Sequence, residues 1–334
     1  METEIIKKTI VKLLEDKGLG QVILPISSVS GGYMHRMYRA ETEHGTFAVK
    51  HLNPGVIKRP DALGNFKNAE RYESMLESAG IPIVPAIVID GSKMQELGDE
   101  YFYIFRWQEG SITDWYDISA KQCRIAGSIQ GRIHRIDPRR IEKREPQPSA
   151  IDWNGYIAEA ERQCSVTEHI LRENKGLLYY AQDAVNRARD ALPALECIVD
   201  EDMDPKNVMW DEGKPYVIDL ECLERGNPVS SALQLSLQWA GVTTCRIDPD
   251  KLNAFFEGYI AAYDNGFRDY GSVFGLAYTW IEWLEFNIGR ALGRCEDEAE
   301  RETGIAETLN TVARIRYLRE NEDLLVSSLN RLFD

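Results

Sequence analysis

The chain has 334 residues, of which 43% are hydrophobic and 28% charged, and its formal net charge is −15. This length allows two substantial hydrophobic cores. The negative charge disfavours contact with a phosphate backbone, so nucleic acid is not an expected partner. We find no apolar run long enough to cross a membrane and no signal-peptide pattern, so we expect no membrane partner. The six cysteines are scattered without a Cys-x-x-Cys pair, which is typical of reduced thiols in a cytoplasmic protein.

The N-terminal part of the chain alternates short strands with turns. Residues 28–33 form a loop rich in serine and glycine, and strands are predicted on both sides of it. Such a loop lets backbone N–H groups approach phosphates closely, although Gly31-Gly32 alone is more often an ordinary hairpin turn. The elements predicted after the loop are strands at 37–41, 44–50, 81–89 and 100–105, and an amphipathic helix at 66–79.

The chain beyond about residue 118 is predicted to be mostly helical, because apolar residues recur there at intervals of three and four. Polar and proline-rich segments separate the periodic stretches, as in residues 139–149. The predicted helices span residues 118–136, 157–173, 177–191, 232–240, 252–263, 273–292 and 302–325.

Residues 200–221 differ from the predicted helices around them, because they contain several carboxylates beside a predicted hairpin. Short strands at 208–210 and 216–218 flank the turn Asp211-Glu-Gly. Asn207 and Asp219 each lie six residues from the glycine of that turn, so folding the hairpin is predicted to make them cross-strand neighbours. Asp202 lies in the loop that leads into the first strand. Oxygen ligands of this kind suit Mg²⁺, which usually completes its shell with nucleotide phosphates and water.

The sequence motif of this segment, D-x-D-P-K-N-V-x-W followed by V-I-D-x-E, resembles that of the aminoglycoside phosphotransferase family. This family is related to choline kinases and spore-coat kinases. That family usually has a histidine where this chain has Asp200. The histidine is chiefly a structural hydrogen-bonding residue, so we expect the chemistry to survive its replacement. The resemblance implies an α+β, protein-kinase-like two-lobe fold, with a small β-rich nucleotide-binding lobe at 1–107 and a larger helical lobe at 108–334.

The resemblance also implies a role for each part of a phosphoryl-transfer site that uses ATP or GTP with Mg²⁺. Asp202 would orient the acceptor hydroxyl and take its proton. Asn207 and Asp219 would hold the metal ion that bridges the phosphates, and Lys50 would neutralise phosphate charge. The residues implied to contact the nucleotide through the loop are Ser30, Gly31 and Gly32.

Three further expectations follow from the same template. Glu70 on the helix at 66–79 is the preferred carboxylate partner of Lys50, and Glu73 is the alternative. Backbone groups around Phe105 to Trp107 would meet the nucleotide base. The sequence His134-Arg-Ile-Asp imitates a kinase motif, but no asparagine follows five residues later, so we expect His134 to pack or cap its helix.

The acceptor is predicted to be a small, hydroxylated and cationic molecule such as an aminoglycoside or an amino alcohol. Trp280, Trp283 and Asn287 recur on one predicted helix, and Glu282 and Glu285 are interleaved with them. This pattern indicates either a buried aromatic face with solvated glutamates or the wall of an acceptor site that binds a cation. Other antibiotics, homoserine-like metabolites and sugars stay open as acceptors.

Two more carboxylates near the proposed metal site are candidates for contact with the acceptor. Asp204 could make a hydrogen bond within its loop. Glu221 could reach a metal-bound water or an amine of the acceptor.

Two rival interpretations of the whole chain remain. A non-catalytic relative that binds nucleotide as a scaffold or sensor is disfavoured, because Lys50, Asp202, Asn207 and Asp219 are all present. A protein kinase is disfavoured because the chain has no Asp-Phe-Gly triplet and no room for an activation loop after Asp219.

Overall fold

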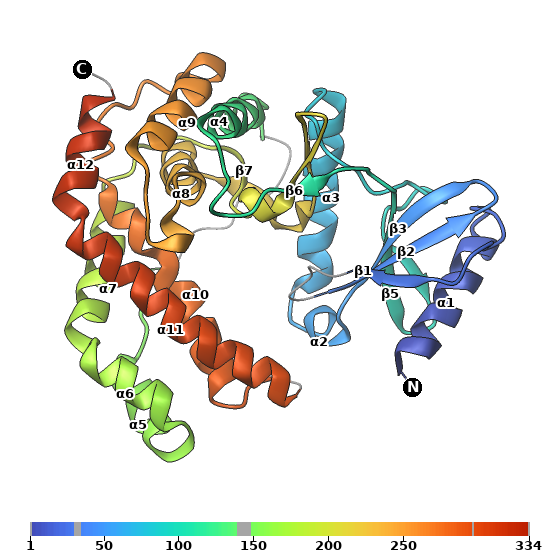
Figure 1. The fold of residues 1–334 in the computed structure, drawn as a ribbon, viewed down its shortest axis with the longest axis horizontal. Coiled ribbons are helices and arrows are strands. Elements are labelled where there is room, and N and C mark those ends of the chain that lie inside the picture. Colours follow the sequence, from blue (N-terminus) through green and yellow to red (C-terminus); the bar gives the residue numbers. More distant parts are fainter. Residues whose placement is uncertain (1, 30–34, 139–147, 296, 333–334) are drawn as a thin grey trace. The chain divides into compact units, whose positions relative to one another are not determined.

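The computed structural model describes residues 2–29, 35–138, 148–295 and 297–332. The chain forms two compact units, which the ribbon in Figure 1 traces from blue to red. The first unit comprises Met1–Ile112 and Asn207–Glu224, and the second comprises Thr113–Lys206 and Arg225–Asp334. This division differs from the expected lobes at 1–107 and 108–334, because the segment 207–224 belongs to the first unit.

A five-stranded antiparallel sheet is the centre of the first unit, with strand order β1-β2-β3-β5-β4. Apolar residues alternate with polar ones along its central strands, so one face of the sheet is buried. The strands are β1 (Ser27–Val29), β2 (Arg36–Thr42), β3 (Gly45–His51), β4 (Gln95–Leu97) and β5 (Glu100–Arg106).

Helices complete the first unit. Helix α1 (Glu2–Asp16) places an apolar stripe against one core of the sheet, in which Ile10 and Phe47 are fully buried. The short helix α2 (Pro54–Ile57) is capped by the side chain of Asn53. Helix α3 (Ala62–Ser78) matches the helix predicted at 66–79 and extends it by one turn at its N-terminus.

The predicted hairpin is present and forms a second, three-stranded sheet with the order β6-β8-β9. Strands β8 (Val208–Asp211) and β9 (Lys214–Val217) are joined by Glu212 and Gly213, whose φ angles of 48° and 81° are both positive, as a type I′ turn requires. Strand β6 (Ser111–Ile112) pairs with β8, and the backbone of residues 82–84 pairs with Val217. These pairings hold the hairpin within the first unit.

The register of this hairpin corrects one prediction. Val208 pairs with Val217, and the N–H of Ile218 donates to the carbonyl of Asn207 at 2.9 Å. Asn207 therefore faces Ile218, and Asp219 lies one residue beyond it. The two-residue turn shifts the pairing by one position relative to a loop centred on the glycine, and Asp219 leaves the strand with a φ of 61°.

The second unit is helical, as predicted, apart from strand β7 (Cys197–Asp200), which pairs with β10 (Leu223–Gly226). Two predicted helices are broken in the structure, at Cys164 and at Asn321, and the N-terminal part of a third is a 3₁₀ helix at Phe274–Thr279. The helices are α4 (Ala120–His134), α5 (Trp153–Gln163), α6 (Ser165–Glu173), α7 (Lys175–Asp190), α8 (Pro228–Ala240), α9 (Pro249–Ala262), α10 (Trp280–Ala291), α11 (Glu298–Glu320) and α12 (Glu322–Arg331).

Helices α4 and α9 cross at very close range, and this crossing supports strand β7. A Cβ atom on Gly127 would lie 2.0 Å from the carbonyl oxygen of Phe255, and one on Gly258 would lie 1.9 Å from that of Arg124. Only glycine allows the two backbones to approach in this way. Helix α4 also packs on β7, which leads directly into the loop that begins at Asp200.

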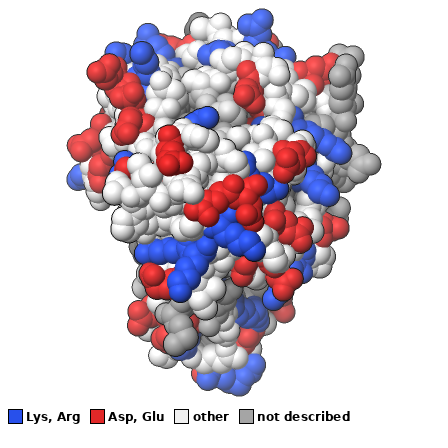
Figure 2. Space-filling model, turned by 90° about the vertical axis from the view of Figure 1, so that its right-hand side faces the viewer, with Lys and Arg blue, Asp and Glu red and all other residues white. Residues whose placement is uncertain are grey.

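Surface charges are mixed rather than segregated on the face drawn in Figure 2, where acidic and basic side chains lie next to one another. The structure also contains surface ion pairs, such as Lys17–Asp90 with a separation of 2.9 Å. None of the helices that the structure describes is both long and apolar enough to cross a membrane.

Candidate active site

The loop after β7 carries the predicted catalytic residue and is held in place by two hydrogen bonds. The buried Asp200 accepts a hydrogen bond from the backbone N–H of Asp202 at 3.2 Å. The carbonyl of Met203 accepts the indole N–H of Trp239, on α8, at 2.9 Å. Asp200 thus supplies a local hydrogen bond that orders the loop at the position where the resembled family usually has histidine.

Lys206 connects the two carboxylates of this loop. Its ammonium donates to Oδ1 of Asp202 at 2.7 Å and to Oδ2 of Asp204 at 2.8 Å. The Asp202 side chain is 36% exposed and that of Asp204 only 9%, so Asp202 is the one that an incoming molecule can reach. Asp204 instead makes hydrogen bonds within the loop, as the sequence predicted, including one from the Lys206 backbone N–H at 3.0 Å.

The electrostatics of the loop follow from this triad. Burial raises the pKa of Asp204 to about 6, and the nearby Asp202 adds to the rise while Lys206 opposes it. Burial alone would lower the pKa of Lys206, but its two carboxylate partners outweigh that effect and hold the pKa above its ordinary value. Lys206 is therefore a firmly charged cation beside Asp202. The sequence analysis missed it, although its place between the carboxylates and Asn207 was a signal.

In the first unit, Lys50 is the centre of a second polar cluster. It lies on β3, is 8% exposed, and donates to Oδ1 of Asp219 at 2.6 Å and to Oε2 of Glu221 at 2.5 Å. Nε2 of His35 lies 3.1 Å from the other oxygen of Glu221. Residues far apart in the sequence therefore meet around one ammonium group, and three of them, Lys50, Asp219 and Glu221, are predicted site residues.

The charges of this cluster stabilise one another. Burial alone would lower the pKa of Lys50, but Asp219 and Glu221 together raise it above its ordinary value. Burial would raise the pKa of Glu221, but Lys50 and His35 hold it down at about 2. Lys50 and Glu221 are therefore both ionised at neutral pH.

The structure pairs Lys50 with Asp219 and Glu221, and not with the predicted Glu70 or its alternative Glu73. Glu70 accepts a hydrogen bond from the hydroxyl of Tyr103 at 2.8 Å, and Glu73 forms an ion pair with Lys93 at 2.9 Å. Both glutamates lie on α3, but each already binds another side chain of the first unit. Lys50 is left to the two carboxylates that follow the hairpin.

The proposed base-binding strand is present as β5, yet one of its expected contacts is already used. Phe105 pairs with Ala48 in the sheet, and the backbone N–H of Trp107 donates to the carbonyl of Thr46 at 3.0 Å. The Trp107 amide is therefore committed to the sheet and cannot also serve a base. The predicted loop residues Ser30, Gly31 and Gly32 lie outside the described residues.

The residues proposed as an acceptor wall already have partners within the second unit. Glu282 receives a hydrogen bond from Arg189 at 2.8 Å, and the Arg314 guanidinium lies 4.9 Å from the centre of the Trp280 ring. The half-buried Trp283 donates its indole N–H to Glu307 at 3.2 Å. A cationic acceptor at this helix would therefore have to exchange places with the cations of the protein itself.

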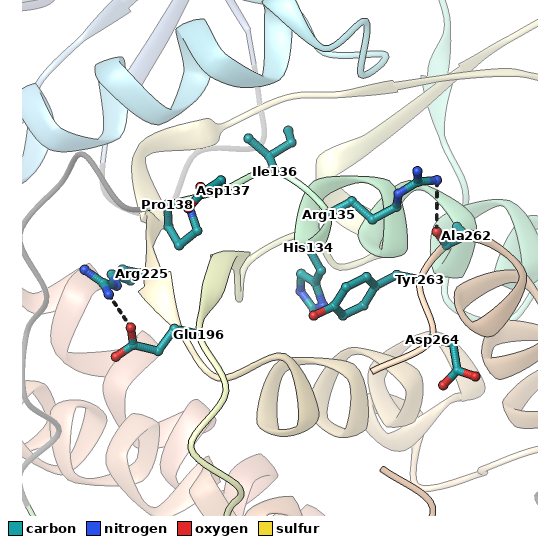
Figure 3. Close-up of a pocket in the computed structure, with 10 residues that line it drawn as sticks. All are labelled: His134, Arg135, Ile136, Asp137, Pro138, Glu196, Arg225, Ala262, Tyr263 and Asp264. Atoms are coloured by element: carbon teal, nitrogen blue, oxygen red, sulfur yellow. Dashed lines mark hydrogen bonds and ion pairs between the residues drawn. The ribbon is translucent and has the colours of Figure 1, made fainter. Parts of the chain in front are cut away.

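A separate pocket of about 610 Å³ lies at the end of α4 (Figure 3). Figure 3 shows His134 beside Tyr263 in its wall, with the ion pair of Arg225 and Glu196 on another side. His134 is buried, and its Nδ1 lies 2.9 Å from the Tyr259 hydroxyl. This packing role is the one expected for His134, so the kinase-like tetrapeptide that it begins is not a catalytic motif.

The oxygen atoms near the hairpin suit the metal ion that the resemblance implies. Asp219 and Glu221 point carboxylate oxygens at a single cation, the Lys50 ammonium, so the cluster is built around positive charge. Asn207 directly precedes β8, at the same end of the hairpin. Among the described residues, no group of three or more His, Cys, Asp or Glu side chains could hold a metal by itself. Mg²⁺ fits such a sparse oxygen set because phosphates complete its shell.

Comparison with solved structures identifies the fold. A spectinomycin phosphotransferase in complex with ADP and spectinomycin superposes with a TM-score of 0.70 at 16% identity, covering 94% of this chain and 98% of the other. A microcompartment-associated aminopropanol kinase gives 0.64 at 13% identity, covering 95% and 99%. The choline kinase of Cryptosporidium parvum gives 0.59 at 12% identity, covering 98% and 99%. The α+β, protein-kinase-like two-lobe fold is thereby confirmed.

A β-rich unit with a buried lysine–carboxylate cluster and a helical unit with an aspartate loop define a phosphotransferase of the protein-kinase-like class. The model of the phosphotransferase enzyme family, abbreviated APH, matches residues 25–273, and the chain belongs to this family. The resemblance drawn from the sequence motifs is thereby confirmed. No curated protein matches the chain closely enough to add to this assignment.

Proposed function

We propose that the protein transfers the γ-phosphate of ATP or GTP to a hydroxyl group of a small molecule, with Mg²⁺. The observation that carries this proposal is the contact between Lys50 and Asp219, whose atoms lie 2.6 Å apart although the residues are 169 positions apart in the chain. A lysine for the phosphates and an aspartate for the metal are the two parts that nucleotide-dependent phosphoryl transfer requires side by side.

Each residue has a defined part in this reaction. Asp202 accepts a hydrogen bond from the acceptor hydroxyl, aligns its oxygen with the γ-phosphorus and takes the proton late in transfer. The new bond joins that oxygen to the γ-phosphorus, and the bond to the β–γ bridging oxygen breaks to release the nucleoside diphosphate. Lys50 neutralises phosphate charge. Asn207 and Asp219 would hold Mg²⁺, which when bound neutralises the charge of the phosphates.

The acceptor that we propose is a small cationic molecule of the aminoglycoside or amino-alcohol kind. The structural neighbours are named for spectinomycin, aminopropanol and choline, and all three carry a hydroxyl and a nitrogen. Asp202 is exposed enough to meet a hydroxyl. The helix with Trp280, Trp283 and Glu282 is the proposed acceptor wall, and Arg314 over Trp280 marks a place where a cation is already favoured.

The experiment that tests the proposal is transfer of labelled γ-phosphate from MgATP and from MgGTP to pooled acceptors. The pools contain aminoglycosides, macrolides, amino alcohols and sugars, and Asp202→Asn is the matched control variant. Transfer to one pool that the variant does not support would establish the activity and name the acceptor class. Nucleotide binding with no transfer to any pool favours the non-catalytic relative, and the absence of both excludes the kinase interpretation.

A further inference from the structure

We propose that Glu221, held by His35, is the residue that positions Lys50 for nucleotide phosphates, in place of a glutamate from helix α3. This inference rests on the proposed function and assigns the carboxylate that orients its phosphate-binding lysine. All the residues concerned lie in the first unit, so their contacts belong to one compact part of the chain.

Both oxygens of the Glu221 carboxylate are engaged, and this fixes its orientation. Oε2 accepts from the Lys50 ammonium at 2.5 Å, while Oε1 lies 3.1 Å from Nε2 of His35. A carboxylate bound through one oxygen can rotate, whereas one bound through both cannot do so without losing a hydrogen bond. Glu221 thus offers Lys50 a partner at a fixed place.

The position of His35 is itself determined by the backbone. Its Nδ1 accepts the N–H of Asn53 at 2.9 Å, so the ring hydrogen is on Nε2 and is donated to Glu221. The ring is 4% exposed and packs near Phe66 of α3, with 6.1 Å between the ring centres. His35 therefore ties Glu221 to the residue that caps α2 and to the core of the first unit.

The glutamates of α3 cannot take this part without breaking other bonds. Glu70 also accepts the backbone N–H of Met94 at 3.2 Å, in addition to the Tyr103 hydroxyl. Glu73 is buried and accepts the backbone N–H of Ala86 at 2.6 Å, besides its ion pair with Lys93. Release of either glutamate would leave buried donors without acceptors, which is costly.

Asp219 is the other carboxylate on Lys50, but it has a competing task. It is a proposed metal ligand, so its oxygen cannot be reserved for the lysine. Glu221 keeps Lys50 in place through an oxygen that His35 holds ready. Asp219 would therefore bind the metal ion, while Glu221 positions Lys50.

The first test compares Glu221→Gln with Glu70→Gln, and uses Glu77→Gln, an exposed change on α3, as the matched control. The readout is the Kd for a fluorescent ADP analogue in the presence of EDTA, together with Tm. Positioning by Glu221 predicts that Glu221→Gln weakens ADP binding about tenfold, because Lys50 then turns to Asp219. Unchanged or tighter binding would overturn the inference, since a carboxylate that only repelled phosphates would give tighter binding when neutralised.

The second test asks whether His35 acts through Glu221. His35→Gln keeps a donor near the place of Nε2, whereas His35→Asn keeps only an acceptor near Nδ1. We expect the Gln variant to retain ADP affinity and the Asn variant to lose it to the same extent as Glu221→Gln. The double variant His35→Asn with Glu221→Gln should bind ADP no more weakly than either single variant. Additive losses, or losses that follow Tm, would contradict the inference.

Measurements on the wild-type protein separate failure of the proposed function from failure of the assignment of Glu221. If wild-type protein binds neither ADP nor ATP, the proposed function fails. If it binds ADP but Glu70→Gln weakens binding as much as Glu221→Gln does, the function stands and the assignment of Glu221 is wrong.

Discussion

The buried histidine at the end of α4 should make the stability of the protein depend on pH. Burial lowers the pKa of His134 from 6.5 to about 3, and no charged group among the described residues contributes to this shift. Its Nδ1 is bound to the Tyr259 hydroxyl, and the Tyr263 ring meets it edge-on at 6.0 Å between centres. Protonation of this imidazole would place an uncompensated charge among aromatic rings.

The sign and size of the effect follow from the two pKa values. Because the folded-state pKa is below the unfolded value, the unfolded chain binds more protons between about pH 3 and pH 6.5. The free energy of unfolding therefore falls as the pH falls through 6.5. With about 1.36 kcal/mol per pH unit, the loss from His134 between pH 7 and pH 5 is about 2 kcal/mol.

The variant His134→Asn isolates this contribution, because its amide can still bond to Tyr259 but does not titrate. The variant is expected to be less stable than wild type at pH 7, since it leaves a cavity. Urea unfolding followed by circular dichroism at pH 5, 6 and 7 should show that this difference shrinks by about 2 kcal/mol at the lowest pH. Parallel pH dependences of the two proteins would refute the reasoning.

Three further changes test other parts of the structure. Gly258→Ala forces a Cβ into a carbonyl oxygen of α4 and should cost about 1–3 kcal/mol or more, seen as a lower Tm, whereas Gly176→Ala, which meets nothing, should not lower it. Lys206→Met should lower kcat at least about tenfold with little change in KM for nucleotide, because Asp202 and Asp204 lose their counter-charge. Lys206→Arg should retain most activity. Equal kcat values for Lys206→Met and wild type would exclude a role of Lys206 in transfer. Glu73→Gln strands the buried ammonium of Lys93 and should cost about 3–5 kcal/mol in urea unfolding, so a loss below about 1 kcal/mol would show that water reaches the pair.

Local chemistry in the sequence was sufficient to predict the elements that carry the site. The Asp-Glu-Gly turn predicted the hairpin because its glycine accepts a positive φ at low cost, and the structure has that turn. The apolar periodicity at 66–79 predicted α3, and the loop wording around Asp202 predicted the fold that the solved structures share. These features depend on neighbours in the chain, so the sequence contains them directly.

The partner of Lys50 could not be obtained in the same way. Helical periodicity placed Glu70 and Glu73 on a plausible face, but the choice of partner depends on which donors reach each carboxylate first. Tyr103 and Lys93 approach from other strands and loops and satisfy the two glutamates. Such competition is decided by tertiary packing and has no local signature.

The breaks in the helices have a similar origin. Cys164 adopts an extended conformation, with φ −154° and ψ 95°, between α5 and α6, although no proline or glycine marks the position. The pairing register near Asn207 also depended on a two-residue turn whose length the sequence left open by one residue. Both errors concern a position, whereas the type of element was right.

In the proposed reaction, Asp202 serves phosphoryl transfer and not nucleotide binding. The most direct measurement is the rate of γ-phosphate transfer by wild type and by Asp202→Asn, with the Kd for the nucleotide measured on the same samples. We expect equal nucleotide affinity and a loss of transfer of at least about a hundredfold in the variant. Transfer at the wild-type rate by Asp202→Asn would show that Asp202 does not take the proton of the acceptor hydroxyl.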